Sequence, residues 1–219
     1  MDWPILAGVP ADDAAALLAV ARRRSFRKGE VVFHAGDPGE ALHLVRKGRF
    51  AVRAMTPRGE VAILSIVGPG EAFGEIALLA DDHERSATVE ALEPAETLSV
   101  VRSEFQRLQA RHPGVAMALA VILTHRVRRL SRRVLVAHYL DADARVRWAV
   151  AELADTYRVG DEAAVAVRLT QDQIAELAGT SRATVNRVLG EEQERGVVQL
   201  ERGRVTVLDS AALHRRARV

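Results

Sequence analysis

The residues best suited to chemistry lie in the stretch 73–89. Gly74 and Glu75 stand near its start, and Arg85 and Ser86 follow ten positions later. A guanidinium offers paired donors to the oxygens of a phosphate, a geometry that an ammonium group lacks. Ser86 adds a hydroxyl donor, and the amides of a short turn or helix start after Gly74 can point at an anion. These features indicate a pocket for a small phosphorylated ligand.

Glu75 needs a different role, because a carboxylate repels a phosphate. It can accept hydrogen bonds from a sugar hydroxyl, or it can orient Arg85. The alternative is that Glu75 and Arg85 form a structural ion pair across a loop, which is common on protein surfaces and contributes little to stability. These residues alone leave both interpretations open.

The same stretch carries a family resemblance. Gly-Glu, a ten-residue span, then Arg-Ser-Ala and the β-branched pair Thr88-Val89 resemble the phosphate-binding cassette of cyclic-nucleotide-binding domains. From Phe26 to Leu208 the chain resembles the CRP/FNR family of bacterial transcription factors. The resemblance implies that the glutamate meets a ribose 2′-hydroxyl while the arginine and serine hold a cyclic phosphate. The binding residues it implies here are Gly74, Glu75, Ile76, Arg85, Ser86 and Thr88.

Composition limits the class of protein. The 219 residues, 48% of them hydrophobic, suffice for one large domain or two ordinary ones, and the formal charge of +2 is nearly balanced. The absence of cysteine excludes disulfides, cysteine–zinc sites and thiolate-held iron–sulfur clusters. The first twenty residues contain Asp12 and Asp13 and no basic leader, and no apolar run approaches the roughly 18 residues of a membrane span. We therefore expect a cytoplasmic protein with no membrane partner.

Short β-rich runs separated by glycines follow an amphipathic helix predicted over Ala11 to Arg23, with Leu17, Leu18 and Val20 as its apolar stripe. The runs are Val31–Phe33, Leu42–Val45, Phe50–Val52, Val61–Val67, Ala87–Val89 and Thr97–Val101. Many short strands at regular spacing predict an antiparallel, jelly-roll-like β-roll. Such a roll encloses a cavity where one ligand fits, and the resemblance puts the cassette there.

A long helix follows the roll. Ser103 and Gln106 have the spacing of a capping box and predict the start of a short helix. A second helix is predicted from Pro113 to Leu140 and would be about 42 Å long. Its apolar positions alternate in steps of four and three as an unbroken heptad seam: Ala116, Ala120, Leu123, Val127, Leu130, Val134 and Ala137. The seam favours a parallel coiled-coil homodimer; the alternative is a single helix packed on its own domain. In the family this helix is both the dimer interface and the back wall of the pocket.

The C-terminal part predicts a winged helix-turn-helix. Thr170 and Gln173 form a capping-box pair, Gly179 turns the chain and Ser181 caps a second helix. Val197–Leu200 and Val205–Leu208 then predict a hairpin with a basic tip.

The second helix and the hairpin tip supply the residues for DNA contact. Arginine suits guanine and asparagine suits adenine in the major groove, whereas phosphate contacts only position the protein. The alternative to DNA binding is that the two helices have only a structural role and merely expose arginines. The pattern Ser-Arg-x-Thr-Val-x-Arg, however, resembles the recognition helix of the family. Glutamate usually occupies the position of Ala183 in cyclic-AMP receptors, so the resemblance leaves the target sequence open. The predicted DNA-binding residues are Ser181, Arg182, Ala183, Thr184, Asn186, Arg187, Arg202 and Arg204.

Together these features predict an α+β protein with three parts: a β-roll sensor (1–111), a long dimerisation helix and hinge (112–140), and a winged helix-turn-helix domain (141–219). We expect a dimeric, non-enzymatic regulator that binds double-stranded operator DNA and RNA polymerase. Its expected effector is a cyclic nucleotide, cyclic AMP first. Leu130-Ser131 stands where cyclic-AMP receptors hold the adenine amino group with threonine and serine, so one hydroxyl is missing.

Two alternatives differ from this function. The first is a regulator of the same family that binds DNA without a ligand. The second is a cupin-like metalloenzyme that uses the β-roll, with His34 and His43 as candidate metal ligands. Their spacing is unlike that of a compact metal triad, and nothing positions a third ligand.

Overall fold

The computed structural model describes residues 3–158, 160 and 162–217. The chain forms two compact units. The first comprises Met1–Ala54 and Leu64–Arg128, and the second comprises Met55–Ile63 and Arg129–Val219. Helix α4 (Gly114–Tyr139) contains the division at residue 128.

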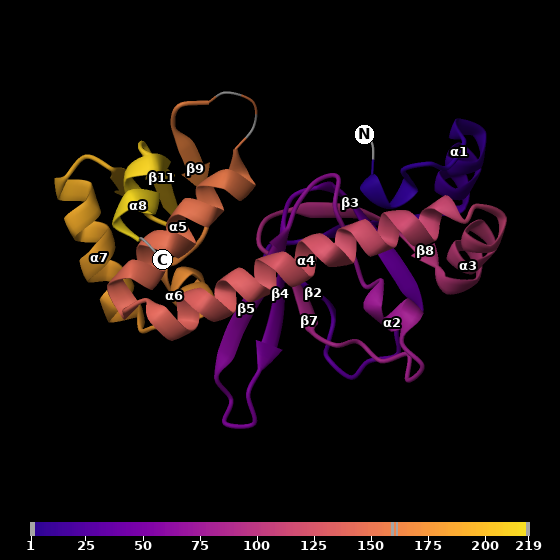
Figure 1. The fold of residues 1–219 in the computed structure, drawn as a ribbon, viewed down its shortest axis with the longest axis horizontal. Coiled ribbons are helices and arrows are strands. Elements are labelled where there is room, and N and C mark those ends of the chain that lie inside the picture. The colour runs from indigo at the N-terminus through magenta and orange to yellow at the C-terminus, as the bar shows by residue number, and fades with distance from the viewer. Residues whose placement is uncertain (1–2, 159, 161, 218–219) are drawn as a thin grey trace. The chain divides into compact units, whose positions relative to one another are not determined.

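The first unit is built around two four-stranded sheets (Figure 1). One sheet has the order β1 (Arg22–Phe26), β8 (Ala95–Val101), β3 (Ala41–Lys47), β6 (Ala72–Phe73), with antiparallel neighbours. The other has the order β2 (Val31–Phe33), β7 (Thr88–Ala91), β4 (Phe50–Met55), β5 (Val61–Val67). Each of the six predicted runs overlaps a strand, which confirms the β-roll. The strands β1 and β6 were not predicted.

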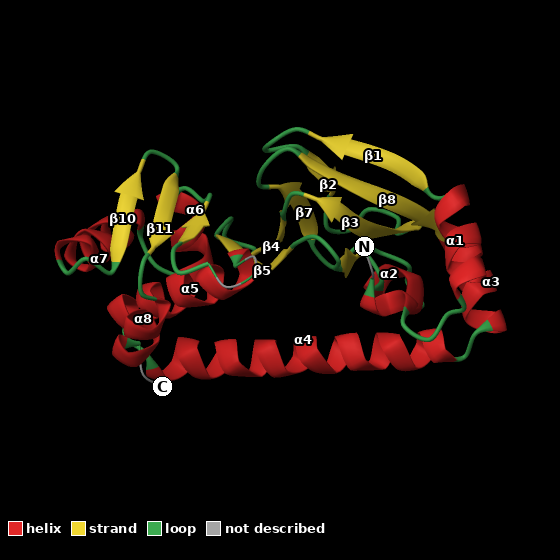
Figure 2. Ribbon diagram, turned by 90° about the horizontal axis from the view of Figure 1, so that it is seen from above, coloured by secondary structure: helices red, strands yellow, loops and turns green. Residues whose placement is uncertain are grey.

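Three short helices accompany the sheets: a 3-10 helix η1 (Pro4–Leu6), α1 (Ala11–Val20) and α3 (Arg102–Arg111). A further single-turn helix, α2 (Ile76–Leu79), lies within the stretch that carries the cassette. Figure 2 shows α1 and α3 beside the same end of the first sheet.

Two predictions for these helices were wrong. The first helix ends at Val20, whose side chain is 59% exposed, and the chain then enters β1, where Phe26 is buried. Pairing with β8 takes precedence over local helix propensity there. Ser103 does not cap α3, which begins at Arg102 without a side-chain cap. The guanidinium of Arg102 instead donates to the carbonyl oxygens of Gly39 at 2.6 Å and Ala77 at 3.0 Å.

The first unit has two hydrophobic clusters. One joins the N-terminal helices, α3 and the start of α4 to the strands β3 and β8, and includes Trp3, Leu42, Phe105 and Leu119. The other fills the roll and consists of Phe26, Val45, Phe50, Val67, Phe73, Val89, Ala91 and Ala95. Burial of these side chains fixes the strands that carry the cassette.

The long helix agrees with its predicted bounds to within one residue at each end. Val115, Leu119 and Val136 are buried on it. The predicted heptad positions are Ala116, Ala120, Val127, Leu130, Val134 and Ala137, which are exposed, and Leu123, which is partly buried. An apolar seam without cover in one chain is typical of a helix that pairs with another helix.

The second unit contains the winged helix-turn-helix that the sequence predicts. Its elements are α5 (Ala142–Tyr157), β9 (Val165–Val167), α6 (Gln171–Ala178), α7 (Arg182–Glu194), β10 (Val198–Glu201), β11 (Arg204–Val207) and α8 (Ser210–Arg216). Thr170 and Gln173 form the predicted capping box, and Gly179 adopts the left-handed conformation (φ 61°) that ends α6. Ser181 caps α7 by accepting a hydrogen bond from the amide of Thr184.

The three strands of this unit form one antiparallel sheet of order β10-β11-β9 (Figure 2). The helix α5 follows Asp141, whose carboxylate caps it by accepting a hydrogen bond from the amide of Ala144 at 2.8 Å. None of the helices in the described part of the chain combines the length and the apolarity that a membrane span requires.

Candidate functional site

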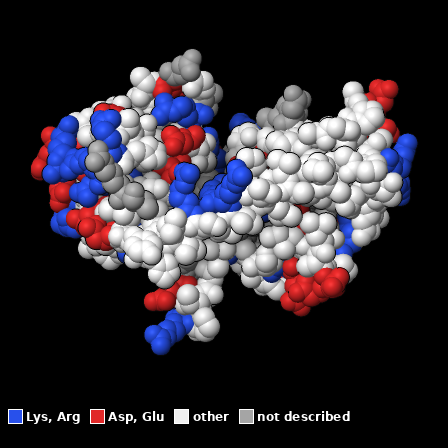
Figure 3. All heavy atoms as spheres, in the orientation of Figure 1, with Lys and Arg blue, Asp and Glu red and all other residues white. Residues whose placement is uncertain are grey.

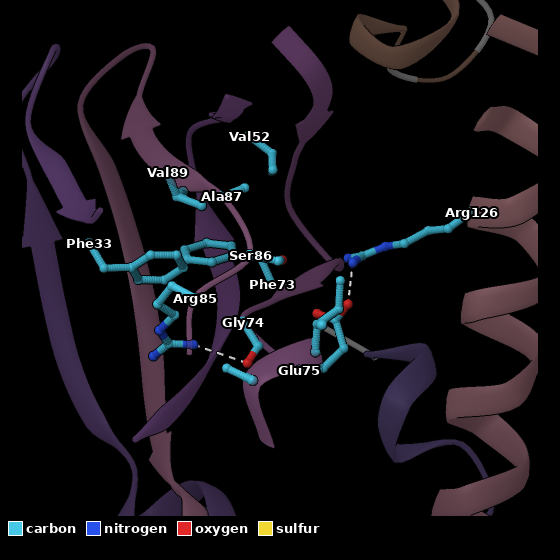
Figure 4. A pocket seen from close by; sticks show the side chains of 12 residues that line it. Phe33, Val52, Phe73, Gly74, Glu75, Arg85, Ser86, Ala87, Val89 and Arg126 are labelled. Atoms are coloured by element: carbon cyan, nitrogen blue, oxygen red, sulfur yellow. Dashed lines mark hydrogen bonds and ion pairs between the residues drawn. The ribbon is translucent and has the colours of Figure 1, made fainter. Parts of the chain in front are cut away.

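Arg85 is the central residue of the site. It precedes β7, and its side chain is buried, with 6% of the residue exposed. Its Nη1 donates to the carbonyl oxygen of Gly74 at 3.0 Å and its Nη2 donates to that of Ala41 at 2.8 Å. The guanidinium carbon lies 4.0 Å from the centre of the Phe33 ring (Figure 4). Among the described residues, Nε has no hydrogen-bond partner.

Gly74 is required by this arrangement. Its φ of 86° belongs to the left-handed region, which side chains disfavour. A Cβ atom at this position would also lie 2.5 Å from Nη1 of Arg85 and 3.1 Å from the carbonyl oxygen of Ala41. Glycine at position 74 therefore allows the backbone to come close enough to hold the guanidinium.

Glu75 does not pair with Arg85. Its carboxylate, on a residue that is 1% exposed, accepts a hydrogen bond from Arg126 of α4 through Oε1. Arg126 also donates to the carbonyl oxygen of Ala72 at 2.9 Å. Within the described residues, Oε2 of Glu75 is buried without a partner. Burial raises the pKa of Glu75, and the charge of Arg126 opposes that rise.

Arg126 was missed as a site residue, although the sequence contains a signal for it. Leu119 and Ile122 pack into the core of the first unit, and Arg126 continues their three-then-four spacing along α4. An arginine in the apolar stripe of a helix needs a buried partner. Its partner here is Glu75, for which the sequence alone predicts a sugar hydroxyl or Arg85 as the partner.

A cavity joins these groups (Figure 4). It is lined by Phe33, Val52, Phe73, Gly74, Glu75, Ile76, Ala77, Arg85, Ser86, Ala87, Val89 and Arg126. Ser86 is exposed at the cavity. The cavity measures about 40 Å³, which is space for a few water molecules. The structure thus brings together five of the eight predicted effector-binding residues, namely Gly74, Glu75, Ile76, Arg85 and Ser86.

The other three residues lie elsewhere. The hydroxyl of Thr88 accepts a hydrogen bond from the amide of Ala35 at 3.1 Å, so it is occupied in joining β7 to the loop after β2. Leu130 and Ser131 belong to the second unit and are exposed on α4. Their role toward an effector stays a prediction.

The charges around the cavity favour an anion. Burial lowers the pKa of Arg85, and the nearby charge of Arg102 lowers it further. The hydrogen bonds of Arg85 go to carbonyl oxygens, which orient the guanidinium without cancelling its charge. His43 lies close by; burial and then the charges of Arg85 and Arg24 lower its pKa to about 3, so this histidine is neutral at physiological pH.

The predicted DNA-binding residues lie on α7 and at the turn of the β10–β11 hairpin. Arg182, Ala183, Asn186 and Arg187 are exposed, and Arg182 pairs with Asp172 at 3.4 Å. Thr184, next to the cap Ser181, is partly buried. Arg202 is exposed and Arg204 pairs with Glu201. In the region of α7, Figure 3 shows basic and acidic atoms side by side.

Both halves of this chain are similar in sequence to known proteins. Residues 23–112 match the model of the cyclic nucleotide-binding domain, and residues 136–216 match that of the Crp-like helix-turn-helix domain. The chain is 36% identical over 210 residues to the cyclic AMP receptor protein of Thermus thermophilus, covering 96% of this chain and 94% of that protein. It is 31% identical over 216 residues to a CRP-like cAMP-activated global transcriptional regulator of Mycobacterium tuberculosis, covering 98% and 96%. The chain belongs to the CRP/FNR family.

Solved structures agree with this assignment. The catabolite activator protein of Thermus thermophilus is 35% identical, with 98% of each chain covered and a TM-score of 0.55. FixK2 from Bradyrhizobium japonicum shares the fold, with a TM-score of 0.79 at 21% identity, covering 90% of this chain and 96% of that one.

CRP/FNR membership decides between the function classes. The family consists of transcription regulators and not of enzymes, so the metalloenzyme alternative is set aside. The two candidate metal ligands have different surroundings. His34 is exposed, whereas His43 is buried and stacked on Phe73. The described residues contain no group of three or more histidine, cysteine, aspartate or glutamate side chains that could hold a metal.

Proposed function

We propose that this CRP/FNR-type regulator is controlled by a cyclic nucleotide, with cyclic AMP as the first candidate. The observation that carries the proposal is a pair of buried polar atoms, Nε of Arg85 and Oε2 of Glu75, which lack partners among the described residues and belong to side chains that line one cavity. A buried polar group without a partner is costly, and a ligand that supplies the missing bonds offsets that cost. The names of the Thermus and Mycobacterium relatives point to cyclic AMP.

The two side chains suit two parts of one nucleotide. A cyclic phosphate accepts from the free N–H groups of Arg85 and from the hydroxyl of Ser86, while the backbone at Gly74 and Ile76 lines the same cradle. A ribose hydroxyl donates to Oε2 of Glu75, whose Oε1 is held by Arg126. The residue that faces the phosphate is positive, and the residue that faces the sugar is an acceptor.

The cavity itself is smaller than a nucleotide. Its space of about 40 Å³ holds a few water molecules, so a bound nucleotide either extends outward past the exposed Ser86 or displaces side chains at the site. Arg126 is the link to the rest of the molecule, because it lines the cavity and belongs to α4, which carries the apolar seam. If the nucleotide binds one arrangement of α4 more tightly, that difference in affinity is the source of control.

The same helix is the proposed homodimer interface. The exposed heptad positions of α4 support pairing with a second copy. We keep the functional division into a sensor (1–111), a dimerisation helix and hinge (112–140) and a DNA-binding domain (141–219). A cytoplasmic location and an interaction with RNA polymerase remain predictions for this chain.

The proposed DNA-reading residues are those that face solvent on α7. Arg182 and Arg187 suit guanine, Asn186 suits adenine, and Ala183 offers only an apolar contact. Phosphate contacts fall to Ser181, Thr184, Arg202 and Arg204. A dimer would place its two α7 helices one DNA turn apart, about 34–36 Å, on a near-palindromic operator.

Calorimetric titration with cyclic AMP and cyclic GMP, beside DNA binding with and without each, tests the proposal. We expect binding of at least one nucleotide, loss of that binding in Arg85→Gln, and retention in the control Arg107→Gln, which changes an exposed arginine of α3 that pairs with Glu104 at 3.0 Å. Circular dichroism melting confirms that the variants fold. Unchanged nucleotide affinity in Arg85→Gln would refute the site. Tight operator binding without binding of either nucleotide would favour the ligand-independent regulator.

A further inference from the structure

The guanidinium of Arg187 is held by two carboxylates in the second unit. Its Nη1 donates to Oδ2 of Asp143 at 3.0 Å and to Oε1 of Glu191 at 2.9 Å, and its Nη2 donates to Oδ1 of Asp143. Glu191 is one turn further along α7, whereas Asp143 belongs to the first turn of α5. Two different helices therefore fix the orientation of one exposed arginine.

The pattern of these bonds leaves a particular edge of the guanidinium free. Asp143 occupies the terminal fork, formed by one N–H from each Nη, and Glu191 takes the second N–H of Nη1. Within the described part of the chain, Nε–H and the second N–H of Nη2 have no acceptor among the contacts of Arg187. These two bonds are parallel and form a second fork, which matches the paired O6 and N7 acceptors of guanine.

We propose that Asp143 is a positioning residue that clamps the terminal fork of Arg187 and so presents the second fork to a guanine. The inference rests on the proposed role of Arg187 in reading DNA. Without the clamp, a long arginine side chain on an exposed helix samples many rotamers and can bind any phosphate. When Asp143 holds the guanidinium, the arginine loses less conformational freedom on binding, and its free N–H groups are oriented toward a base.

The charges of the cluster lead in the same direction. Asp143 offsets the positive charge of Arg187, and Glu191 adds a negative charge that it shares with Arg147 at 3.3 Å and Arg195 at 3.5 Å. Arg187 therefore adds less to the general attraction for the phosphate backbone than a free arginine would. A carboxylate beside DNA also repels phosphates on every sequence, and this lowers binding to wrong sites. The hydrogen bond from Arg187 holds the pKa of Asp143 below its usual range, so this carboxylate is ionised at neutral pH.

Asp143 does not act mainly through stability. Arg187 is 53% exposed and Asp143 is 31% exposed, and ion pairs this accessible to water contribute little to folding. A loss of DNA discrimination in an Asp143 variant would therefore report orientation and not unfolding.

The test uses the full-length protein with two probes: a duplex carrying a site that the wild type selects from a random library, and a random duplex of equal length. The variants are Asp143→Ala, Arg187→Ala and their double, with Asp155→Ala as control, because Asp155 is an exposed carboxylate near the other end of α5. The readouts are the ratio of the two affinities and the dependence of random-duplex binding on salt.

We expect Arg187→Ala to lower the ratio about 5- to 150-fold, the discrimination of one bidentate base contact. Asp143→Ala should lower it at least about fivefold, with random-duplex affinity unchanged or increased and a log–log salt slope steeper by up to about 0.9, because the released arginine can neutralise a phosphate. The double variant should be no worse than Arg187→Ala, and the control should match wild type.

Three results would overturn the inference, and they are distinguishable. If Arg187→Ala lowers the ratio but Asp143→Ala leaves it unchanged, Arg187 reads DNA without the clamp. If Arg187→Ala leaves the ratio unchanged, the base-reading role of Arg187 itself is wrong. Equal losses from Asp143→Ala with and without Arg187 would also contradict the inference, because Asp143 would then act independently of the arginine.

Discussion

We predict that His43 makes the stability of the first unit depend on pH. The side chain lies on β3, on a residue that is 3% exposed, with its ring stacked on Phe73 at a centroid distance of 4.9 Å. Its Nδ1 lies 3.1 Å from the hydroxyl oxygen of Thr97. Burial, followed by the charges of Arg85 and Arg24, lowers its pKa from 6.5 to about 3. A histidine that is neutral in the folded unit takes up a proton on unfolding below pH 6.5.

The sign and size of the effect follow from those two pKa values. Because the folded-state pKa is depressed, the folded unit binds fewer protons, and its free energy of unfolding falls as the pH drops from 6.5 toward 3. A gap of about 3.5 between the pKa values corresponds to about 5 kcal/mol over the whole window, since one unit is ~1.4 kcal/mol. Between pH 7 and pH 5 the loss from His43 amounts to about 2 kcal/mol.

Urea denaturation monitored by tryptophan fluorescence measures this loss. The chain has two tryptophans, and a Trp148→Phe background leaves Trp3, buried in the first unit, as the reporter. We expect His43→Gln to retain about 2 kcal/mol of the unfolding free energy that the parent loses between pH 7 and pH 5. His34→Gln, at an exposed histidine of the same unit, should lose as much as the parent. An equal loss in His43→Gln would show that a buried neutral histidine is not the cause.

Three further changes test the cavity. Gly74→Ala should lower the free energy of unfolding by about 1–2 kcal/mol, because φ at this position is 86°. It should also weaken nucleotide binding at least tenfold, because the added Cβ would clash with Nη1 of Arg85. Unchanged affinity in calorimetry would show that Gly74 does not shape the binding site. Arg126→Gln should lower the free energy of unfolding by about 1–3 kcal/mol, because it leaves the buried Glu75 without its cation. Adding Glu75→Gln to that variant should restore part of the lost free energy in urea titrations. No restoration would mean that Arg126 acts through other contacts. Leu130→Thr should increase the affinity for cyclic AMP up to about 100-fold in calorimetry, because it supplies a hydroxyl. An unchanged affinity would mean that residue 130 does not contact the purine.

The features predicted correctly depend on short-range rules. The helix-turn-helix was predictable because Thr170, Gln173, Gly179 and Ser181 are caps and turns whose partners lie within a few residues. The long helix was predictable because its seam repeats regularly over its whole length. Residues 74–85 also encode much of the geometry around Arg85, because they contain both the glycine that the backbone requires and the arginine that its carbonyl oxygen holds. The role of these residues toward a phosphate stays a prediction.

The features that were missed depend on residues far apart in the chain. Glu75 and Arg126 are separated by 51 positions, and no local pattern around Glu75 indicates which cation will reach it. The end of α1 is set by pairing between β1 and β8, and the start of α3 is set by Arg102 reaching Gly39 and Ala77. In each case a tertiary contact outweighs a local preference.

The two arginines proposed to bind ligands show how their partners fit them for different tasks. Arg85 is buried and donates to the carbonyl oxygens of Gly74 and Ala41, which fix its orientation and leave its charge intact. Burial lowers its pKa and so opposes the charged form, and an anion at the free edge offsets this opposition. Arg187 is exposed and is held by carboxylates, which fix its orientation and offset its charge. A buried arginine with neutral acceptors is therefore suited to bind an anion, whereas an exposed arginine with anionic acceptors is suited to recognise the neutral edge of a base.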